Sequence, residues 1–455
     1  MKKVLAVLLS LVFVLFMAAC TSNTPTVTSS QGEQTTAAPT QGEQTTAAPT
    51  QEEHEPVTIQ FWDCTSSDFR VTMFKELKDR FEKIYPWITV ELLGLPNSES
   101  IAKCTAALEQ GIGPDCFNIT TSALTTFADG GHLIPLDDYI EAWDEKDFMY
   151  KNNTEYLRSR AADGKLYYIP YTSNVTVMWY NKTLYDKNSV DAPETWDDIF
   201  DSVEALKDPD GKYYPLTIRG GSGGAEFLYK YIYDYMQTDI QTGDDGYSNL
   251  YNEKAVEFCD KYLNLYNKGF CPESDITADY KAMTAEFDTG YVALFGHNLG
   301  SYPNHVEVFP SMNMEFACMH MPKGADGQVY DSMSVSGQAI TDTCEHPYEA
   351  FLWLAYIASK EGNSYVNECL GQLPINSAVA GDAWLDDAFH IAAAMEWAGS
   401  DWFHQYSLIN VSGWGNMLNN EVTPEMQACM QGTLDADTFV KNWKTYLDKL
   451  IDESK

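Results

Sequence analysis

Strand-like and helix-like segments alternate along this chain, and this alternation restricts the fold more than any other feature of the sequence. Residues 57–62, 87–92 and 116–119 have the apolar composition of buried strands. Residues 73–85 carry apolar side chains at helical spacing, and residues 100–109 form a second predicted helix. Alternation at these lengths indicates βα units and a parallel sheet, so an α/β fold is expected.

The same pattern returns in the second half of the chain. Residues 290–295 and 314–319 are predicted strands, and residues 348–359 and 439–451 are predicted amphipathic helices. The part of the chain after residue 56 has about 400 residues, which exceeds the usual size of a single core. Two lobes are therefore expected.

The chain begins with a segment typical of export. A lysine pair and an apolar run too short for a membrane span precede Ala18, Ala19 and Cys20, so residues 1–19 are a predicted secretory signal. A cysteine at this place resembles the lipobox of bacterial lipoproteins, although Met17 stands where leucine is usual. The resemblance implies cleavage before Cys20 and lipidation of its thiol. The alternative is an ordinary secretory signal followed by a chance cysteine.

Residues 20–56 are predicted to form a flexible tether after this cysteine. They are rich in Thr, Ser, Gln, Ala and Pro, and the sequence QGEQTTAAPT at 31–40 repeats at 41–50. So little apolar bulk cannot offset the entropy cost of folding. A spacer of about 36 residues should span roughly 30–35 Å, which would let a globular body move clear of a membrane surface.

Charge and cysteine content exclude several classes of partner and cofactor. The chain has 29 basic and 66 acidic residues, a formal net charge of −37, so we expect no binding to nucleic acid. The nine cysteines after Cys20 show neither CxxC nor zinc-finger spacing, and the histidines are dispersed without an HExxH motif. No metal and no cofactor are therefore expected, and the cysteines are interpreted as buried thiols.

A series of motifs occurs in a fixed order over most of the chain. The motifs are GIGPD at 111–115, ADGGHLIPLDDYI at 128–140, DGKLYYIP at 163–170, VMWYNKTL at 177–184, APETWDDIF at 192–200, HPYEAFLWLAYIASKEG at 346–362 and GQLPINSAV at 371–379. Thr195 is a predicted helix N-cap, with Asp198 completing a capping box. This succession resembles the maltose-binding-protein-like family of extracellular solute-binding proteins of carbohydrate ABC transporters. Each motif is loose alone, and their order carries the resemblance.

The resemblance implies a two-lobed fold like that of periplasmic binding proteins. Each lobe would hold a mainly parallel sheet flanked by helices, with a ligand cleft between the lobes. Residues 57–172 and 337–385 would form one lobe, and residues 173–336 and 386–455 the other.

The resemblance also implies a function without catalysis. The protein would be a monomer that binds a carbohydrate, an oligosaccharide, and delivers it to the permease subunits of an ABC importer. The lipid on Cys20 would hold it on the extracellular face of the cell membrane, in a Gram-positive bacterium.

Candidate ligand-binding residues follow predicted strands or lie near the predicted crossing between lobes, because ligands of open α/β sheets bind beyond the carboxyl ends of the strands. The candidates are Thr65, Ser66, Thr120, Ser122, Tyr171, Asn174, Arg219, Glu226, His297, Asn298 and Trp414. The residues that follow the predicted strands 116–119 and 290–295 differ from the usual sugar contacts of the family. A pocket unlike that of a close maltose binder is therefore expected.

Three of these candidates have a stated role. Tyr171 and Trp414 are proposed to stack on sugar faces, and the alternative is that each ring belongs to the core or the surface. Arg219 precedes a glycine-rich loop and could bind a carboxylate or two sugar hydroxyls. Its alternative is an ion pair with Glu226 or another acid.

Two other classes of function remain open from the sequence. A secreted glycan-active hydrolase would need two facing carboxylates, but the acidic doublets are adjacent in sequence and do not face each other. GGSGG at 220–224 could present Ser222 as a nucleophile if it followed a strand directly. A binding protein for a non-sugar solute is the second alternative, since one fold hosts many ligands.

Overall fold

The structure, a computed structural model, describes residues 54–121, 124–409, 411 and 413–454. The predicted signal, Cys20 and most of the predicted tether lie outside the described residues, as does Ser122. None of the helices in the described part of the chain is both long and apolar enough to cross a membrane.

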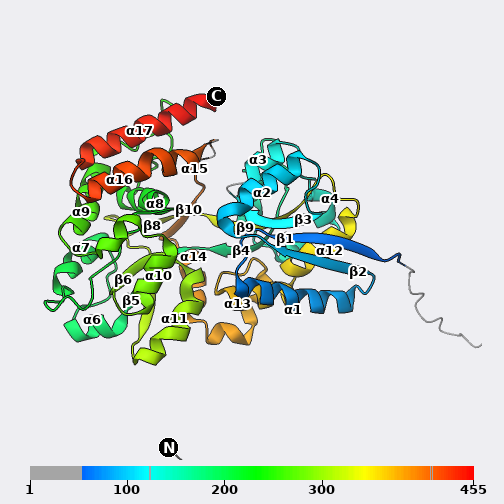
Figure 1. The fold of residues 1–455 in the computed structure, drawn as a ribbon, viewed down its shortest axis with the longest axis horizontal. Helices are drawn as coiled ribbons and strands as arrows, with labels where there is room; N and C mark the ends of the chain where they lie inside the picture. Colours follow the sequence, from blue (N-terminus) through cyan, green and yellow to red (C-terminus); the bar gives the residue numbers. More distant parts are fainter. Residues whose placement is uncertain (1–53, 122–123, 410, 412, 455) are drawn as a thin grey trace, which may run out of the picture. The chain divides into compact units, whose positions relative to one another are not determined.

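The first sheet has five strands in the order β2-β1-β3-β9-β4 (Figure 1). The strands are β1 (Val57–Asp63), β2 (Ile88–Gly94), β3 (Cys116–Thr120), β4 (Ile169–Asn174) and β9 (Ser334–Ile340). β1 pairs in parallel with β2 and β3, whereas β9 runs antiparallel to β3 and β4. The predicted βα start of the chain is confirmed, and a strand from the second half of the chain completes the sheet.

Helices α1 (Asp68–Ile84), α2 (Asn97–Glu109) and α12 (Pro347–Ala358) belong to the same lobe. The N-cap of α1 is Ser67, whose side chain accepts a hydrogen bond from the Arg70 amide. The apolar face of α1 includes Phe81, which packs edge-on against Trp353 of α12 with ring centroids 5.1 Å apart. Such buried aromatic pairs stabilise the packing of the helices on the sheet.

The second lobe contains a three-stranded sheet in the order β6-β5-β7. The strands are β5 (Thr176–Asn181), β6 (Leu294–Asn298) and β7 (Phe316–His320). β5 is antiparallel to both neighbours, so the expectation of mainly parallel sheets is wrong here. The two predicted strands are present as β6 and β7, and α11 (Tyr302–Val308), which was not predicted, follows β6 in the chain. In the sheet, β5 from an earlier part of the chain lies between them.

Two predicted strands of this lobe differ from the structure. The strand expected at 290–295 begins only at Leu294, because Gly290 has a positive φ of 70° and turns the chain. His297 and Asn298 therefore belong to β6 rather than to a loop after it. The segment YPLTI at 214–218 forms only a single bridge, between Tyr214 and Val292. Pro215 lacks an N–H group, which limits its pairing in a sheet.

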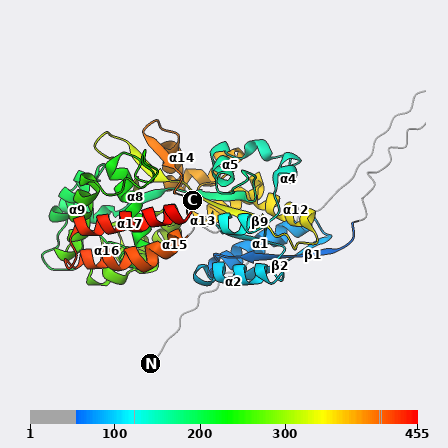
Figure 2. The same ribbon diagram turned by 90° about the horizontal axis from the view of Figure 1, so that it is seen from above.

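Four helices pack against one another in the second lobe (Figure 2). They are α8 (Gly224–Met236), α9 (Glu253–Asn267), α16 (Thr423–Met430) and α17 (Ala436–Glu453). The predicted capping box of Thr195 and Asp198 is confirmed at the start of α7 (Trp196–Ala205). Buried apolar residues form one large cluster around each of the two main sheets, and these clusters are the cores of the two lobes.

The chain passes directly from one sheet to the other between β4 and β5, with only Val175 between them. A second passage joins β8 (Val329–Ser332) to β9 through Met333. β8 pairs in parallel with β10 (Phe403–Tyr406). The lobe boundaries given by the sequence stay a prediction.

Candidate functional site

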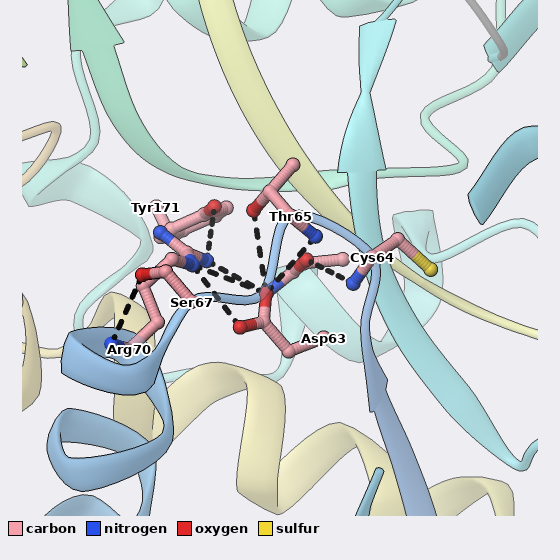
Figure 3. A network of polar contacts seen from close by, with 7 residues as sticks. Asp63, Cys64, Thr65, Ser67, Arg70 and Tyr171 are labelled. Atoms are coloured by element: carbon pink, nitrogen blue, oxygen red, sulfur yellow. Dashed lines mark hydrogen bonds and ion pairs between the residues drawn. The ribbon is translucent and has the colours of Figure 1, made fainter. Parts of the chain in front are cut away.

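The carboxylate of Asp63 organises the segment that follows β1 (Figure 3). It accepts hydrogen bonds from Nε and Nη2 of Arg70, the shortest at 2.9 Å, and from the amide and hydroxyl of Thr65 at 3.3 Å. Arg70 Nη2 also donates to the hydroxyl of Tyr171 at 3.2 Å. Burial opposes the charge of Arg70, but Tyr171 and Asp63 outweigh it and raise the pKa of the guanidinium. This buried network holds the segment rigidly against the sheet.

Tyr171 belongs to this network rather than to an open surface. It is the unpaired residue of a β-bulge in β4, where the register with β9 shifts between Pro170 and Thr172. A bulge redirects side chains, and the ring of Tyr171 is only 3% exposed. In this structure Tyr171 can contact a ligand only at a small part of its ring.

Thr65 and Ser66 remain partly exposed at the end of β1. The amide of Ser66 donates to the carbonyl of Leu95 at 3.0 Å, which ties the segment to the chain after β2. Two hydroxyl groups are therefore held beside the carboxyl ends of β1 and β2, where ligands of α/β sheets bind. Thr120 ends the neighbouring strand β3.

Asn174 and Asn298 lie at the passage between the sheets and bond to backbone. Asn174 Oδ1 accepts from the amide of Leu299 at 3.0 Å, and Asn298 Oδ1 accepts from the amide of Gly300 at 3.0 Å. The carbonyl of Asn298 also accepts from the indole of Trp179 at 3.2 Å. Both asparagines fix the end of β6 relative to the chain after β4.

Close packing explains the glycines of the loop at 220–224. A Cβ on Gly220 would lie 2.4 Å from the carbonyl oxygen of Asp275, and one on Gly221 would lie 2.3 Å from that of Thr277. Gly223 has a φ of 80°, and a Cβ there would lie 2.4 Å from Nη2 of Arg219. Because no strand precedes Ser222 directly, the loop lacks the strand–turn–helix form of a nucleophile elbow.

Arg219 is held between two aromatic rings. Its guanidinium carbon lies 5.4 Å from the ring centroid of Phe227 and 5.9 Å from that of Tyr280, and its Nε donates to the carbonyl of Ser222 at 2.6 Å. Burial lowers the pKa of this guanidinium, although nearby acids oppose the shift. No ion pair of Arg219 occurs among the described residues.

Glu226 does not neutralise Arg219 directly. Its carboxylate lies 3.9 Å from Nζ of Lys230, one turn along α8, and its side chain is 41% exposed. The ion pair that the sequence left open as an alternative for Arg219 is therefore not formed with Glu226. The terminal nitrogens of the guanidinium have no carboxylate partner among the residues described, so they could donate to a ligand.

His297 completes what we name the arginine cluster, formed by Arg219, Phe227, Tyr280 and His297. The imidazole is stacked at 5.9 Å on Phe227 and at 5.6 Å on Tyr280, and it is 8% exposed. Within the described part of the chain, its Nδ1 is buried and has no hydrogen-bond partner. Burial, followed by the charge of Arg219, lowers the pKa of His297 to about 3, so the ring is neutral at physiological pH.

Trp414 begins the short helix α15 (Trp414–Met417) directly after Gly413, which has a φ of 84°. The ring is partly buried and meets Tyr229 edge-on, with centroids 5.1 Å apart. Its Nε1 is buried and has no hydrogen-bond partner among the residues that the structure describes. The ring of Trp414 is therefore neither fully buried in the core nor fully exposed, so its burial is intermediate between the two cases considered from the sequence.

The structure thus gathers the sequence candidates into separate groups. Thr65, Ser66 and Tyr171 lie together in one lobe, and Arg219, Glu226 and His297 lie together in the other. Phe227 and Tyr280 were missed, because only the folded chain brings them to Arg219. Asp63 and Arg70 were missed as well, and the polar turn after β1 was their only signal.

Among the described residues, no group of three or more His, Cys, Asp or Glu side chains is placed to hold a metal ion. The groups of the two lobes offer hydroxyls, a guanidinium and aromatic rings. Such groups can bind a polar organic molecule without covalent chemistry.

Comparison with known proteins establishes the family. A family model described as bacterial extracellular solute-binding protein matches residues 71–364. The chain belongs to this family. The solute-binding proteins similar to it include the multiple sugar-binding protein of Streptococcus mutans, 25% identical over 220 residues that cover 46% of this chain and 48% of the relative. The galactooligosaccharide-binding protein of Bacillus subtilis is 22% identical over 319 residues, which cover 68% and 71% of the two chains.

The fold is also that of solved solute-binding proteins. The structure of the GacH receptor of Streptomyces glaucescens aligns with a TM-score of 0.74 at 20% identity, and covers 88% of this chain and 100% of the receptor. The two-lobed α/β fold expected from the sequence is therefore confirmed. The description of the family names its members as extracellular solute-binding proteins.

Proposed function

We propose that this solute-binding protein captures a carbohydrate, an oligosaccharide, between its lobes and delivers it to the permease of an ABC importer. The observation that carries the proposal is family membership over residues 71–364, together with relatives named for sugars. The structure of the GacH receptor was described in complex with acarbose and an acarbose homologue, which supports an oligosaccharide as the class of ligand.

The two groups of candidate residues provide the chemistry that a sugar requires. The C–H faces of a sugar pack on aromatic rings, and its hydroxyl groups pair with polar side chains. In the proposed complex, Arg219 donates to ligand oxygens from its terminal nitrogens, and Phe227 and Tyr280 hold the guanidinium in place. Thr65 and Ser66 offer hydroxyls from the other lobe. Closure of the lobes about Val175 and Met333 would bury the ligand.

The proposal includes a lipid anchor at Cys20 and a tether over residues 20–56. The signal-like start of the chain, the cysteine after two alanines and the repeated low-complexity segment support it. Anchoring would keep the receptor near its permease, and the body would act as a monomer.

A thermal-shift screen of the mature full-length protein against a panel of glycans tests the function. A neutral oligosaccharide should raise the melting temperature and be recovered chemically unchanged, which distinguishes a receptor from a hydrolase. Stabilisation by a non-sugar solute alone would contradict the proposal.

Arg219→Met should then weaken binding of the identified glycan by about tenfold or more, since a hydrogen bond from a charged group contributes about 1.5–3 kcal/mol. Arg80→Met is the matched control, because Arg80 pairs with Glu76 on the surface of α1. Equal affinities of the two variants would remove Arg219 from the site.

A further inference from the structure

Two cysteines far apart in sequence meet in the interior of the first lobe. Cys64 directly follows β1, and Cys104 lies in α2. Their Sγ atoms are 3.2 Å apart, and the residues are 0% and 1% exposed. All nine cysteines of the body lie in the described part of the chain. Cys116 and Cys259 also have a cysteine in their surroundings, Cys344 and Cys429, but among the described residues a hydrogen bond between thiols joins Cys64 and Cys104 alone.

This separation is that of a hydrogen bond between two thiols, from which a small shift would bring the sulfurs to bonding distance. A disulfide requires an S–S distance of about 2.05 Å, so the two sulfurs would have to approach each other by about 1.1 Å. The pair also lies in a protein whose family is extracellular, and exported proteins meet conditions in which disulfides form and persist. One such pair among the nine body cysteines leaves seven free thiols.

We propose that Cys64 and Cys104 form a disulfide bond in the exported protein. The bond would tie the segment that carries Thr65 and Ser66 to α2. The carboxylate of Asp63 already holds that segment in place through its hydrogen bonds with Thr65. In Figure 3 the sulfur of Cys64 points away from this carboxylate. The disulfide therefore adds a covalent restraint to a part of the lobe proposed to face the ligand.

The oxidant is a second disulfide, either of a small molecule or of an oxidoreductase. The thiolate of one of the two cysteines attacks one sulfur of this disulfide and releases the other sulfur as a thiolate. The second cysteine, as its thiolate, then attacks the first cysteine in the mixed disulfide and releases the remaining sulfur of the oxidant. The two cysteines lose two protons and two electrons, and the oxidant gains both as two thiols. Because both sulfurs are buried in the folded lobe, the exchange occurs before α2 packs onto the sheet.

Peptide mapping of the full-length protein, purified from an exporting host without reductant, tests the bond. Free thiols are alkylated in denaturant before digestion. We expect a linked peptide that joins Cys64 to Cys104, two hydrogens lighter than the sum of its parts and split by reductant. Recovery of both cysteines in the alkylated form, also after refolding in a glutathione redox buffer, would overturn the proposal. A bond from either residue to a different cysteine would overturn it as well.

A second measurement does not depend on mapping. Reductant should lower the melting temperature of the wild-type protein by about 5 °C, because the disulfide restricts the unfolded chain. The Cys64→Ala/Cys104→Ala double variant should show no such shift. Cys271→Ala should keep the wild-type shift, since Cys271 is also buried and no cysteine among the described residues acts on its thiol. An identical effect of reductant on the wild type and the double variant would contradict the bond.

Discussion

At the scale of single residues, Tyr171 and Arg219 take their surroundings from residues that are distant in the chain. Tyr171 was expected to offer its ring to a sugar, but it is buried and its hydroxyl accepts from Arg70, 101 residues away in the chain. Arg219 was left between a ligand contact and an ion pair, and the structure shows two flanking rings instead. Contacts over such separations leave no periodic signal in the sequence, so only the folded chain reveals them.

His297 should make the stability of the protein depend on pH. Burial lowers its folded-state pKa to about 3, below its ordinary value of 6.5. Between these values the unfolded chain binds more protons, so stability is complete above pH 6.5 and falls as the pH falls toward 3. The contribution lost at pH 5 is about 2 kcal/mol.

Urea unfolding of the His297→Phe variant at pH 7.5 and pH 5 measures this contribution. The variant should lose about 2 kcal/mol less than the wild type between the two conditions. His132→Phe, at a partly exposed position, should behave like the wild type. An unchanged difference between the two pH values in the His297 variant would show that the imidazole is not held neutral.

Trp414 permits a second prediction at this scale. Its partly buried ring contacts Tyr229 at one edge, so Trp414→Ala should cost less stability than the roughly 3–5 kcal/mol expected for Trp443→Ala, whose ring is fully buried. If a sugar covers the remaining ring, Trp414→Ala should also weaken binding by about 1–3 kcal/mol. Melting temperature and ligand affinity of both variants test this. A stability loss equal to that of Trp443→Ala with unchanged affinity would place Trp414 in the core alone.

At the scale of secondary-structure elements, a local capping motif was predicted correctly from the sequence, whereas the direction of the strands was not. The capping box of Thr195 and Asp198 needs only residues three apart, and it is present as predicted. The strand expected at 290–295 moved to Leu294–Asn298, because a glycine with positive φ ends the preceding turn. β5 precedes β6 and β7 in the chain but lies antiparallel between them in the sheet, so its place depends on long-range pairing of strands. Apolar periodicity shows which face a strand buries and carries no information about its neighbours.

At the scale of the whole molecule, the order of loose motifs proved more informative than any one of them. Together they indicated the family and the two-lobed fold, which the family match and the similarity to solved structures confirm. The passages at Val175 and Met333 could not be predicted from the sequence, because they depend on which strands join which sheet. The buried carboxylate of Asp331 stabilises the chain next to the first passage, because it accepts hydrogen bonds from the amide and hydroxyl of Thr176 at 2.6 and 2.8 Å. Such ties favour movement of the lobes as rigid bodies.

The proposed attachment to the membrane leads to the last prediction. A lipid on Cys20 would hold the protein by its acyl chains, and the strongly acidic body would not bind an anionic membrane by charge. Cys20→Ala should therefore move the protein from the membrane fraction into the medium, or leave it with its signal uncleaved. Fractionation of cells followed by intact-mass measurement of the N-terminus distinguishes these outcomes. Ser22→Ala, two residues further along, should remain in the membrane fraction with a cleaved and lipidated N-terminus. A Cys20→Ala protein that is cleaved normally and still sediments with membranes would show that something other than a lipid on this cysteine attaches it.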